Sequence, residues 1–186
     1  KASIDQTTAG LLLSAIISDT LMFRSPTCTD TDREAAEKLA EIAGVQIEEL
    51  ATGMFQAGSD FKRKPIDEIF YQDFKTFSAD ETEFGVAQVS AISTTILDPL
   101  RKRLMRFLPE VLTAKNVEMV YILLTDIIGE SSEVLFAGKD AGQILCKAFQ
   151  REDEEAEDGS LLLPGVVSRK KQFIPPIINA LQESDD

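Results

Sequence analysis

Residues 117–128 form a nearly unbroken apolar run that is rich in β-branched side chains. A run of this length and composition, followed by turn residues, is typical of a buried strand. A strand that is apolar on both sides has to be covered on both faces of its sheet. This segment therefore predicts a central strand, and it points to an α/β arrangement for the second half of the chain.

Turn and periodicity signals place further elements around this strand. Strands are expected at residues 73–78, 83–92 and 133–137, with a short one ending at Val167. Helices are expected from Pro65 to about Tyr71, at 139–149 and from near Pro175 and Pro176, together with a long helix that has Pro99 in its first turn. Pro109 should kink or interrupt the long helix, because proline lacks a backbone donor and clashes with the preceding turn. The predicted fold of residues 66–186 is α/β, a mixed β-sheet lobe with flanking helices.

The first part of the chain has a different pattern. Its first predicted helix, residues 6–22, is apolar nearly all round and must be buried on most sides. A second helix is expected to open at the capping-box pattern Thr31-Asp32-Arg33-Glu34 and to stop at Gly44. A third helix follows, and residues 1–57 are predicted to be helical throughout. Residues 58–65 are polar, are punctuated by glycine and proline, and are predicted to be a linker.

Charge and composition exclude several classes of function. The formal net charge is −13, whereas a nucleic-acid binder needs a basic face, so no nucleic-acid partner is expected. No apolar stretch approaches the ~20 residues that span a bilayer, and no signal peptide is visible, so no membrane partner is expected. The isolated cysteines Cys28 and Cys146 fit a cytoplasmic location. Because histidine is absent, any catalysis has to use carboxylates, cations or bound metals, or the chain is incomplete.

The strongest local signal for chemistry is Ser168-Arg169-Lys170-Lys171-Gln172, which precedes the last predicted helix. Three adjacent cations repel one another, so their clustering in an acidic chain needs a reason. A helix N-terminus would add amide donors and its dipole, arginine offers phosphate a two-pronged donor, and lysine offers a point charge. The segment is therefore interpreted as an oxyanion or phosphate clamp in an exposed loop. A solvated basic turn is the alternative.

Asp19 is the second candidate, because it lies within the strongly apolar segment Ser14–Phe23. An ionised carboxylate that is buried without a partner costs several kcal/mol. We therefore expect Asp19 to meet a cation, a metal ion or a set of donors. A pairing with Arg24, or a hydrogen bond at the helix end, is the structural alternative.

Other charged residues point less clearly to a function. Lys75 follows Phe74 on a predicted strand, so it either reaches into a cleft or decorates the solvent face. The cations among residues 101–106 are interpreted as the wet side of the long helix. The acidic run Glu152–Asp158 lacks the ligand spacing of a calcium loop and is interpreted as a solvated loop. Asp126, at the end of the central strand, is either a capping residue or an acid that supports a site.

Two segments resemble the family II, manganese-dependent (DHH-type) inorganic pyrophosphatases. One is Ala9–Thr20, which ends in Ser-Asp-Thr and continues into Phe23–Thr29, and the other is Gly165–Gln172 with its Ser-Arg-Lys-Lys-Gln motif. Shorter matches lie between them, so the resemblance covers essentially the whole chain. In combination the two segments are specific, and they favour the clamp over the basic turn.

The resemblance implies a division into lobes. Residues 1–57 would be a remnant of an N-terminal DHH lobe, and residues 66–186 would be the substrate-binding DHHA2 lobe. It maps one metal ligand to Asp19. The cations that it assigns to diphosphate binding are Lys75, Arg169 and Lys170, and Ser168 and Gln172 of the same motif are also expected to bind the substrate.

By resemblance, diphosphate is hydrolysed to two orthophosphates between the lobes, with Mn²⁺ or Co²⁺ ions and with Mg²⁺ on the substrate. The Asp-His-His motif and the histidine ligands of the family have no counterpart in this chain. We therefore expect a C-terminal fragment that grips diphosphate, has the DHH lobe as its partner, holds no catalytic metal pair and is inactive alone. A homodimer of the parent protein is left open.

Two rival functions are also left open. One is a phosphoesterase of the same superfamily that acts on polyphosphate or a nucleotide, and the other is a non-catalytic phosphate-binding module.

Overall fold

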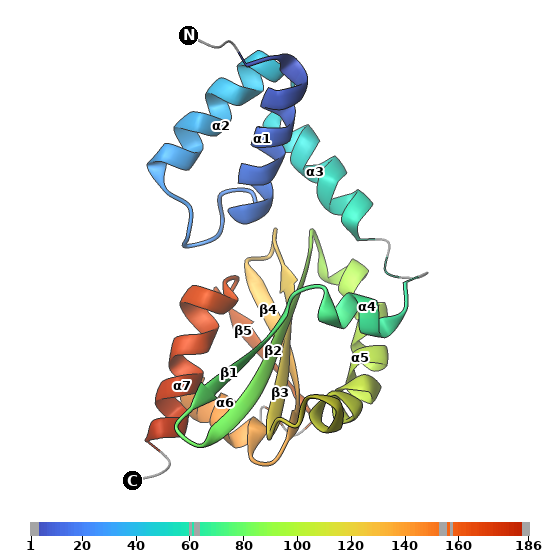
Figure 1. The fold of residues 1–186 in the computed structure, drawn as a ribbon, viewed down its shortest axis with the longest axis vertical. Helices are drawn as coiled ribbons and strands as arrows, with labels where there is room; N and C mark the ends of the chain where they lie inside the picture. The colour runs from blue at the N-terminus through green and yellow to red at the C-terminus, as the bar shows by residue number, and fades with distance from the viewer. Residues whose placement is uncertain (1–3, 60, 62–63, 153–155, 157, 184–186) are drawn as a thin grey trace. The chain divides into compact units, whose positions relative to one another are not determined.

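The computed structural model describes residues 4–59, 61, 64–152, 156 and 158–183. The chain divides into two compact units, residues 1–59 and 60–186 (Figure 1). The first unit has one hydrophobic core and the second has two. The first unit is helical, and the second combines a sheet with helices. Among the described residues, no helix is long and apolar enough to cross a bilayer.

The first unit consists of the helices α1 (Gln6–Asp19), α2 (Asp30–Ala43) and α3 (Ile47–Gly58). On α1, one row of side chains, Ala9, Leu13 and Ile17, is fully buried in a core shared with α2 and α3. Residues four apart lie on the same side of a helix, which explains the row. Leu11 is 68% exposed and Leu12 is 45% exposed. The prediction that this helix is buried on most sides is therefore wrong for this unit.

Helix α1 ends at Asp19 rather than at residue 22. The hydroxyl of Thr20 donates to a carbonyl of the last turn at 2.7 Å and accepts the amide of Phe23 at 3.2 Å. Leu21, Met22 and Phe23 then have left-handed backbone, with φ of 47°, 56° and 65°. Left-handed residues other than glycine are strained, by roughly 1–2 kcal/mol each. Because this backbone cannot continue a right-handed helix, Asp19 lies at a helix end.

The cap of α2 also differs from the prediction. Thr29 is the N-cap: its hydroxyl accepts the amide of Asp32, and the Asp32 carboxylate accepts the amide and the hydroxyl of Thr29. The Thr29 hydroxyl and then its amide lower the pKa of Asp32. The capping box is therefore formed by Thr29 and Asp32, and the pattern at residues 31–34 lies inside the helix. The predicted stop at Gly44 is confirmed, since Gly44 has the left-handed φ of 69° that glycine tolerates best.

The second unit is built on a five-stranded sheet in the order β1-β2-β3-β4-β5. Its strands are β1 (Phe74–Ala79), β2 (Thr82–Ala91), β3 (Met119–Asp126), β4 (Ser131–Gly138) and β5 (Ser160–Pro164). Strands β2 and β3 are parallel, and the other neighbouring pairs are antiparallel. The prediction of a mixed sheet with a central strand near residues 117–128 is confirmed.

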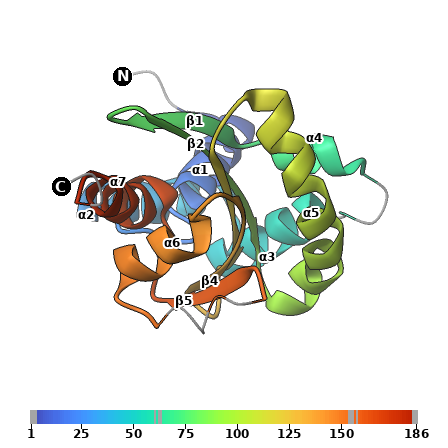
Figure 2. The same cartoon turned by 90° about the horizontal axis from the view of Figure 1, so that it is seen from below.

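Helices cover both faces of this sheet (Figure 2). The helices α4 (Ile66–Tyr71) and α5 (Thr94–Lys115) lie on one face, and α6 (Ala141–Phe149) and α7 (Ile174–Gln182) lie on the other. Alternate residues of β3 enter the two cores, Tyr121 and Leu123 on the α6–α7 face and Val120 and Ile122 on the α4–α5 face. All four are fully buried, which confirms that the central strand is covered on both sides.

Helix α5 crosses from β2 to the parallel strand β3. It begins at Thr94, so Pro99 lies in its second turn rather than in its first, and it runs through Pro109 without interruption. The helix starts earlier than predicted because buried side chains on both sides of each proline, Leu97 and Leu100 around Pro99 and Leu108 and Val111 around Pro109, hold it against the sheet. Asp126, at the end of β3, accepts the amide of Thr94 at 3.2 Å and that of Gly129 at 2.8 Å, so it caps α5 and the following turn.

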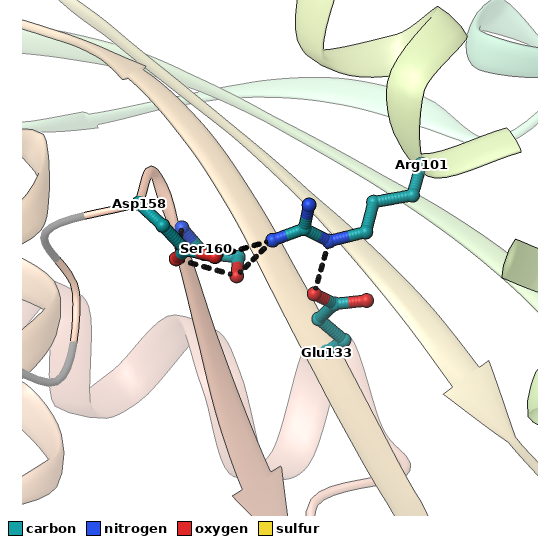
Figure 3. A network of polar contacts seen from close by, with 4 residues as sticks. All are labelled: Arg101, Glu133, Asp158 and Ser160. Atoms are coloured by element: carbon teal, nitrogen blue, oxygen red, sulfur yellow. Dashed lines mark hydrogen bonds and ion pairs between the residues drawn. The ribbon is translucent and has the colours of Figure 1, made fainter.

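Helix α5 is also tied to the edge of the sheet by the side chain of Arg101 (Figure 3). Its Nε donates to Oε1 of Glu133 on β4 at 2.7 Å. Its Nη2 donates to Oδ2 of Asp158 at 2.6 Å and to Oγ of Ser160 at 2.8 Å. Arg103 likewise donates to two backbone carbonyls of the segment before α4. The interpretation of these cations as a wet helix face is therefore wrong for Arg101 and Arg103. Most of the acidic run that ends at Asp158 lies outside the described residues.

We expect Arg101→Ala to lower the free energy of unfolding by about 1–2 kcal/mol, because it removes three partly exposed, charge-assisted hydrogen bonds. Chemical denaturation followed by circular dichroism measures this loss. Arg106→Ala removes an exposed arginine from the same helix and should change the free energy by less than about 0.5 kcal/mol. Equal losses for the two variants would contradict a stabilising network at Arg101.

Candidate anion-binding site

The predicted clamp lies where β1 begins beside the later part of β2. The register pairs Lys75 of β1 with Val86 of β2. The clamp segment, Gly165–Gln172, is hydrogen-bonded to this part of the sheet through Arg169. It leads into α7 through the π-helical turn Arg169–Phe173. Such wide turns are uncommon, and they often occur at functional sites.

Arg169, in the clamp segment, is buried, with only 8% of its surface exposed. Its Nη2 forms an ion pair with Oδ1 of Asp73 at 2.7 Å. Its Nη1 donates to the backbone carbonyl of Asp73 at 2.5 Å and to that of Val86 at 3.2 Å. The expectation that Arg169 lies in an exposed loop is wrong, because these acceptors draw the guanidinium onto the sheet. Lys170, the next residue, is exposed.

Ser168 and Gln172 shape the backbone of the clamp segment. Oγ of Ser168 accepts the amide of Lys171 at 3.3 Å and so caps the π-helical turn. Oε1 of Gln172 accepts the amides of Val167 and Ser168, both at 3.0 Å, and Nε2 donates to the carbonyl of Gly165 at 2.7 Å. Some amide donors that the sequence suggested for an anion are therefore already taken by these two side chains.

Gln88 on β2 is a site residue that the sequence analysis missed. Its Nε2 donates to Oγ1 of Thr125 at 2.9 Å and to the carbonyl of Val167 at 3.0 Å, and its Oε1 accepts the amide of Arg169 at 3.4 Å. Thr125 in turn bonds to the hydroxyl of Ser132 on β4 at 2.8 Å. This polar row fastens the clamp segment across three strands. A polar amide within an apolar strand must find partners, and that signal was present in the sequence.

Lys75 lies on the same side of the sheet as the clamp segment. Because it pairs directly with Val86, the two side chains share a face, and this is the face that carries α7. The carbonyl of Val86 also accepts from Arg169. Lys75 is exposed, so its ammonium group is open to a ligand. The sequence-predicted residues that come together on this face are Lys75, Ser168, Arg169 and Gln172.

Asp19 belongs to the other unit, at the C-terminal end of α1. It is exposed, so the expectation of a buried carboxylate is wrong. Asp19 follows the buried Ile17 by two positions, and two helical residues turn a side chain by roughly 200°, away from the buried row. The exposed carboxylate remains accessible to a metal ion.

The DHHA2 domain family matches residues 52–180 of the chain. The chain belongs to this family. A cobalt-dependent inorganic pyrophosphatase from Clostridium perfringens is 46% identical over 169 residues, which are 91% of this chain and 30% of that protein. The manganese-dependent inorganic pyrophosphatase of Bacillus subtilis is 39% identical over 180 residues, which are 97% of this chain and 57% of that protein.

The DHHA2 chain also shares its fold with a solved structure. A Methanococcus jannaschii protein assigned to the family II inorganic pyrophosphatases has a crystal structure with a TM-score of 0.84 to this chain and 39% sequence identity. The match covers 98% of this chain and 58% of that one. The resemblance seen in the sequence is therefore confirmed. This chain spans 30% to 58% of the length of these three proteins.

The names of two of these relatives specify cobalt and manganese. In the part of the chain that the structure describes, no three Asp, Glu, Cys or His side chains come together as a metal-binding group. Asp19 offers one carboxylate oxygen of a kind that Mn²⁺ accepts, but a metal centre of this type needs several protein ligands. The described residues therefore fit one ligand of a metal site and not a whole site.

We expect Gln88→Ala in this DHHA2 chain to lower the free energy of unfolding by about 2 kcal/mol, because it strips partners from the Val167 carbonyl and the Arg169 amide. Amide hydrogen exchange in the clamp segment should accelerate more than in the rest of the sheet. Mass spectrometry of exchange measures both effects. Gln182→Ala, an exposed position at the end of α7, is the control and should leave exchange in the clamp segment unchanged. Unchanged exchange in Gln88→Ala would count against the fastening role.

Proposed function

We propose that this chain is the substrate-binding part of a metal-dependent inorganic pyrophosphatase, which hydrolyses diphosphate to two orthophosphates. The observation that carries the proposal is the placement of Lys75 and Arg169 on one face of one sheet, with the exposed Lys170 next in the chain. In a chain whose net charge is −13, this grouping favours an anionic ligand, bound by the donors of Arg169 that Asp73 leaves free and by the exposed ammonium groups. The names of the relatives support diphosphate as that ligand.

Arg169 is the part of this site with a defined geometry. A guanidinium has five N–H donors, and Arg169 directs three hydrogen bonds to Asp73 and Val86. The donors that remain, on Nε and Nη2, form a flat fork that suits two oxygens of one phosphate group. Such a fork binds and orients diphosphate, and it offsets the charge that grows on the leaving phosphate.

Lys75 and Lys170 complement this fork with exposed ammonium groups. An ammonium group is a point charge on a flexible stem, so it can follow phosphate oxygens without a fixed geometry. Ser168 and Gln172 contribute indirectly, since their side chains hold the backbone of the clamp segment in shape. In this scheme Arg169 sets the orientation of the diphosphate, and Lys75 and Lys170 add positive charge.

The proposal includes a metal centre that this chain supplies only in part. We place the Mn²⁺ or Co²⁺ ions on a DHH lobe of a longer, cytoplasmic protein, with Asp19 as one ligand, residues 1–57 as a remnant of that lobe, and Mg²⁺ on the substrate. Such ions, when bound, provide a hydroxide nucleophile at neutral pH. The residues of this chain bind and orient the diphosphate and stabilise its charge.

The chain by itself should release no orthophosphate from diphosphate in the presence of Mn²⁺, Co²⁺ or Mg²⁺. The reason is that its described residues form no metal-binding group, so no activated nucleophile is available. A colorimetric phosphate-release assay measures this, with the Bacillus subtilis enzyme run in parallel as the positive control. Turnover near that of the complete enzyme would refute the proposal that this chain lacks the catalytic metals.

In the complete enzyme, Lys170→Ala should lower kcat/KM for diphosphate about tenfold through the loss of one charged contact, and Arg169→Ala should lower it about 100-fold through the loss of the fork. Lys170→Ala should leave the melting temperature unchanged because Lys170 is exposed, whereas Arg169→Ala should also lower it because Arg169 is buried against Asp73. Steady-state kinetics and thermal unfolding measure the two effects.

Lys139→Ala is the matched control for charge. Lys139 is 86% exposed and follows β4 at the end of the sheet away from the clamp segment, so its loss should leave kcat/KM unchanged. If Arg169→Ala and Lys170→Ala behave like this control, the clamp does not exist.

A further inference from the structure

We propose that Asp73 is a positioning residue for diphosphate binding, because it holds Arg169 with the free edge of its guanidinium turned to the ligand. This inference rests on the proposed function. It extends the site to a residue outside the Ser168–Gln172 motif, in the turn that leads into β1.

Two oxygen atoms of Asp73 accept hydrogen bonds from the guanidinium of Arg169. Oδ1 pairs with Nη2 at 2.7 Å, and the backbone carbonyl accepts from Nη1 at 2.5 Å. The carbonyl of Val86 accepts from the same Nη1 at 3.2 Å. Three acceptors thus fix the plane of the guanidinium, and the hydrogens that remain on Nε and Nη2 are left for a ligand.

The burial of Arg169 makes its orientation depend on Asp73. The side chain of Arg169 is only 10% exposed, whereas that of Asp73 is 49% exposed. A buried cation that loses its counter-ion is left with an uncompensated charge. The guanidinium of Arg169 would then have to turn toward water to be solvated. Asp73 also lies only two residues before Lys75, in the turn that leads into β1. One short stretch of chain therefore presents an ammonium group to the ligand and orients the guanidinium.

A carboxylate beside a binding cation can also act as a competitor of the substrate. The geometry favours positioning, because Asp73 takes the Nη end of the guanidinium and leaves the Nε edge open. The two roles predict opposite signs. Removal of a competitor would raise kcat/KM for diphosphate, and removal of a positioning residue lowers it.

The test is a double-mutant cycle in the complete enzyme with Asp73→Ala, Arg169→Ala and the combined variant. We expect kcat/KM for diphosphate to fall about tenfold for Asp73→Ala and about 100-fold for Arg169→Ala. The combined variant should match Arg169→Ala within about twofold, because Asp73 acts through Arg169. Asp73→Asn keeps an acceptor oxygen without the charge, so it should recover part of the loss.

Glu83→Ala is the control, since it removes the same charge from the other end of the β1–β2 pair and should stay within about twofold of the unaltered enzyme. Melting temperatures identify the variants that fold, and Asp73→Asn replaces Asp73→Ala in the cycle if the latter does not. An unchanged or higher kcat/KM without the Asp73 carboxylate, or losses that multiply in the combined variant, would overturn the positioning role. An unchanged kcat/KM in Arg169→Ala would overturn the proposed function itself, so the two failures are distinguishable.

Discussion

The site depends on a guanidinium group that is almost removed from water. A buried cation is tolerated only when acceptors surround it, and Arg169 finds them in the carboxylate and carbonyl of Asp73 and the carbonyl of Val86. All three acceptors lie where β1 begins beside β2. The register of these two strands therefore decides where the arginine sits and which of its donors stay free.

The rest of the second unit stabilises the region where β1 begins beside β2. The polar row formed by Gln88, Thr125 and Ser132 crosses three strands and ties the clamp segment to the sheet. On the opposite face, α5 packs its buried leucines on the sheet and reaches β4 and β5 through Arg101. A side chain on such a rigid base is oriented more closely than one on a free loop. The exposed lysines beside it keep the freedom to adapt.

The elements that the sequence predicted well are those with long, uniform patterns. The apolar run at residues 117–128 predicted the central strand β3, because burial on both faces makes nearly every position along it apolar up to Thr125 and Asp126 at its end. The errors lie at boundaries. Helix α5 starts before Pro99 because tertiary packing outweighs the local effect of proline, and α1 stops at Asp19 because Thr20 bonds back to the helix and the next residues turn left-handed. Thr29 and Asp32 formed the capping box in place of the pattern two residues later.

By itself, the sequence determined the mixed sheet with flanking helices, the family, and the segment that carries the cations. Periodicity and a contiguous motif are local properties, so they can be seen without coordinates. Only the tertiary structure decided that Arg169 is buried, that Asp73 and Gln88 hold its segment, and that Asp19 is exposed. The physical reason is distance along the chain: Arg169 and Asp73 are 96 positions apart and Arg169 and Gln88 are 81, and only the folded sheet brings them within hydrogen-bonding reach.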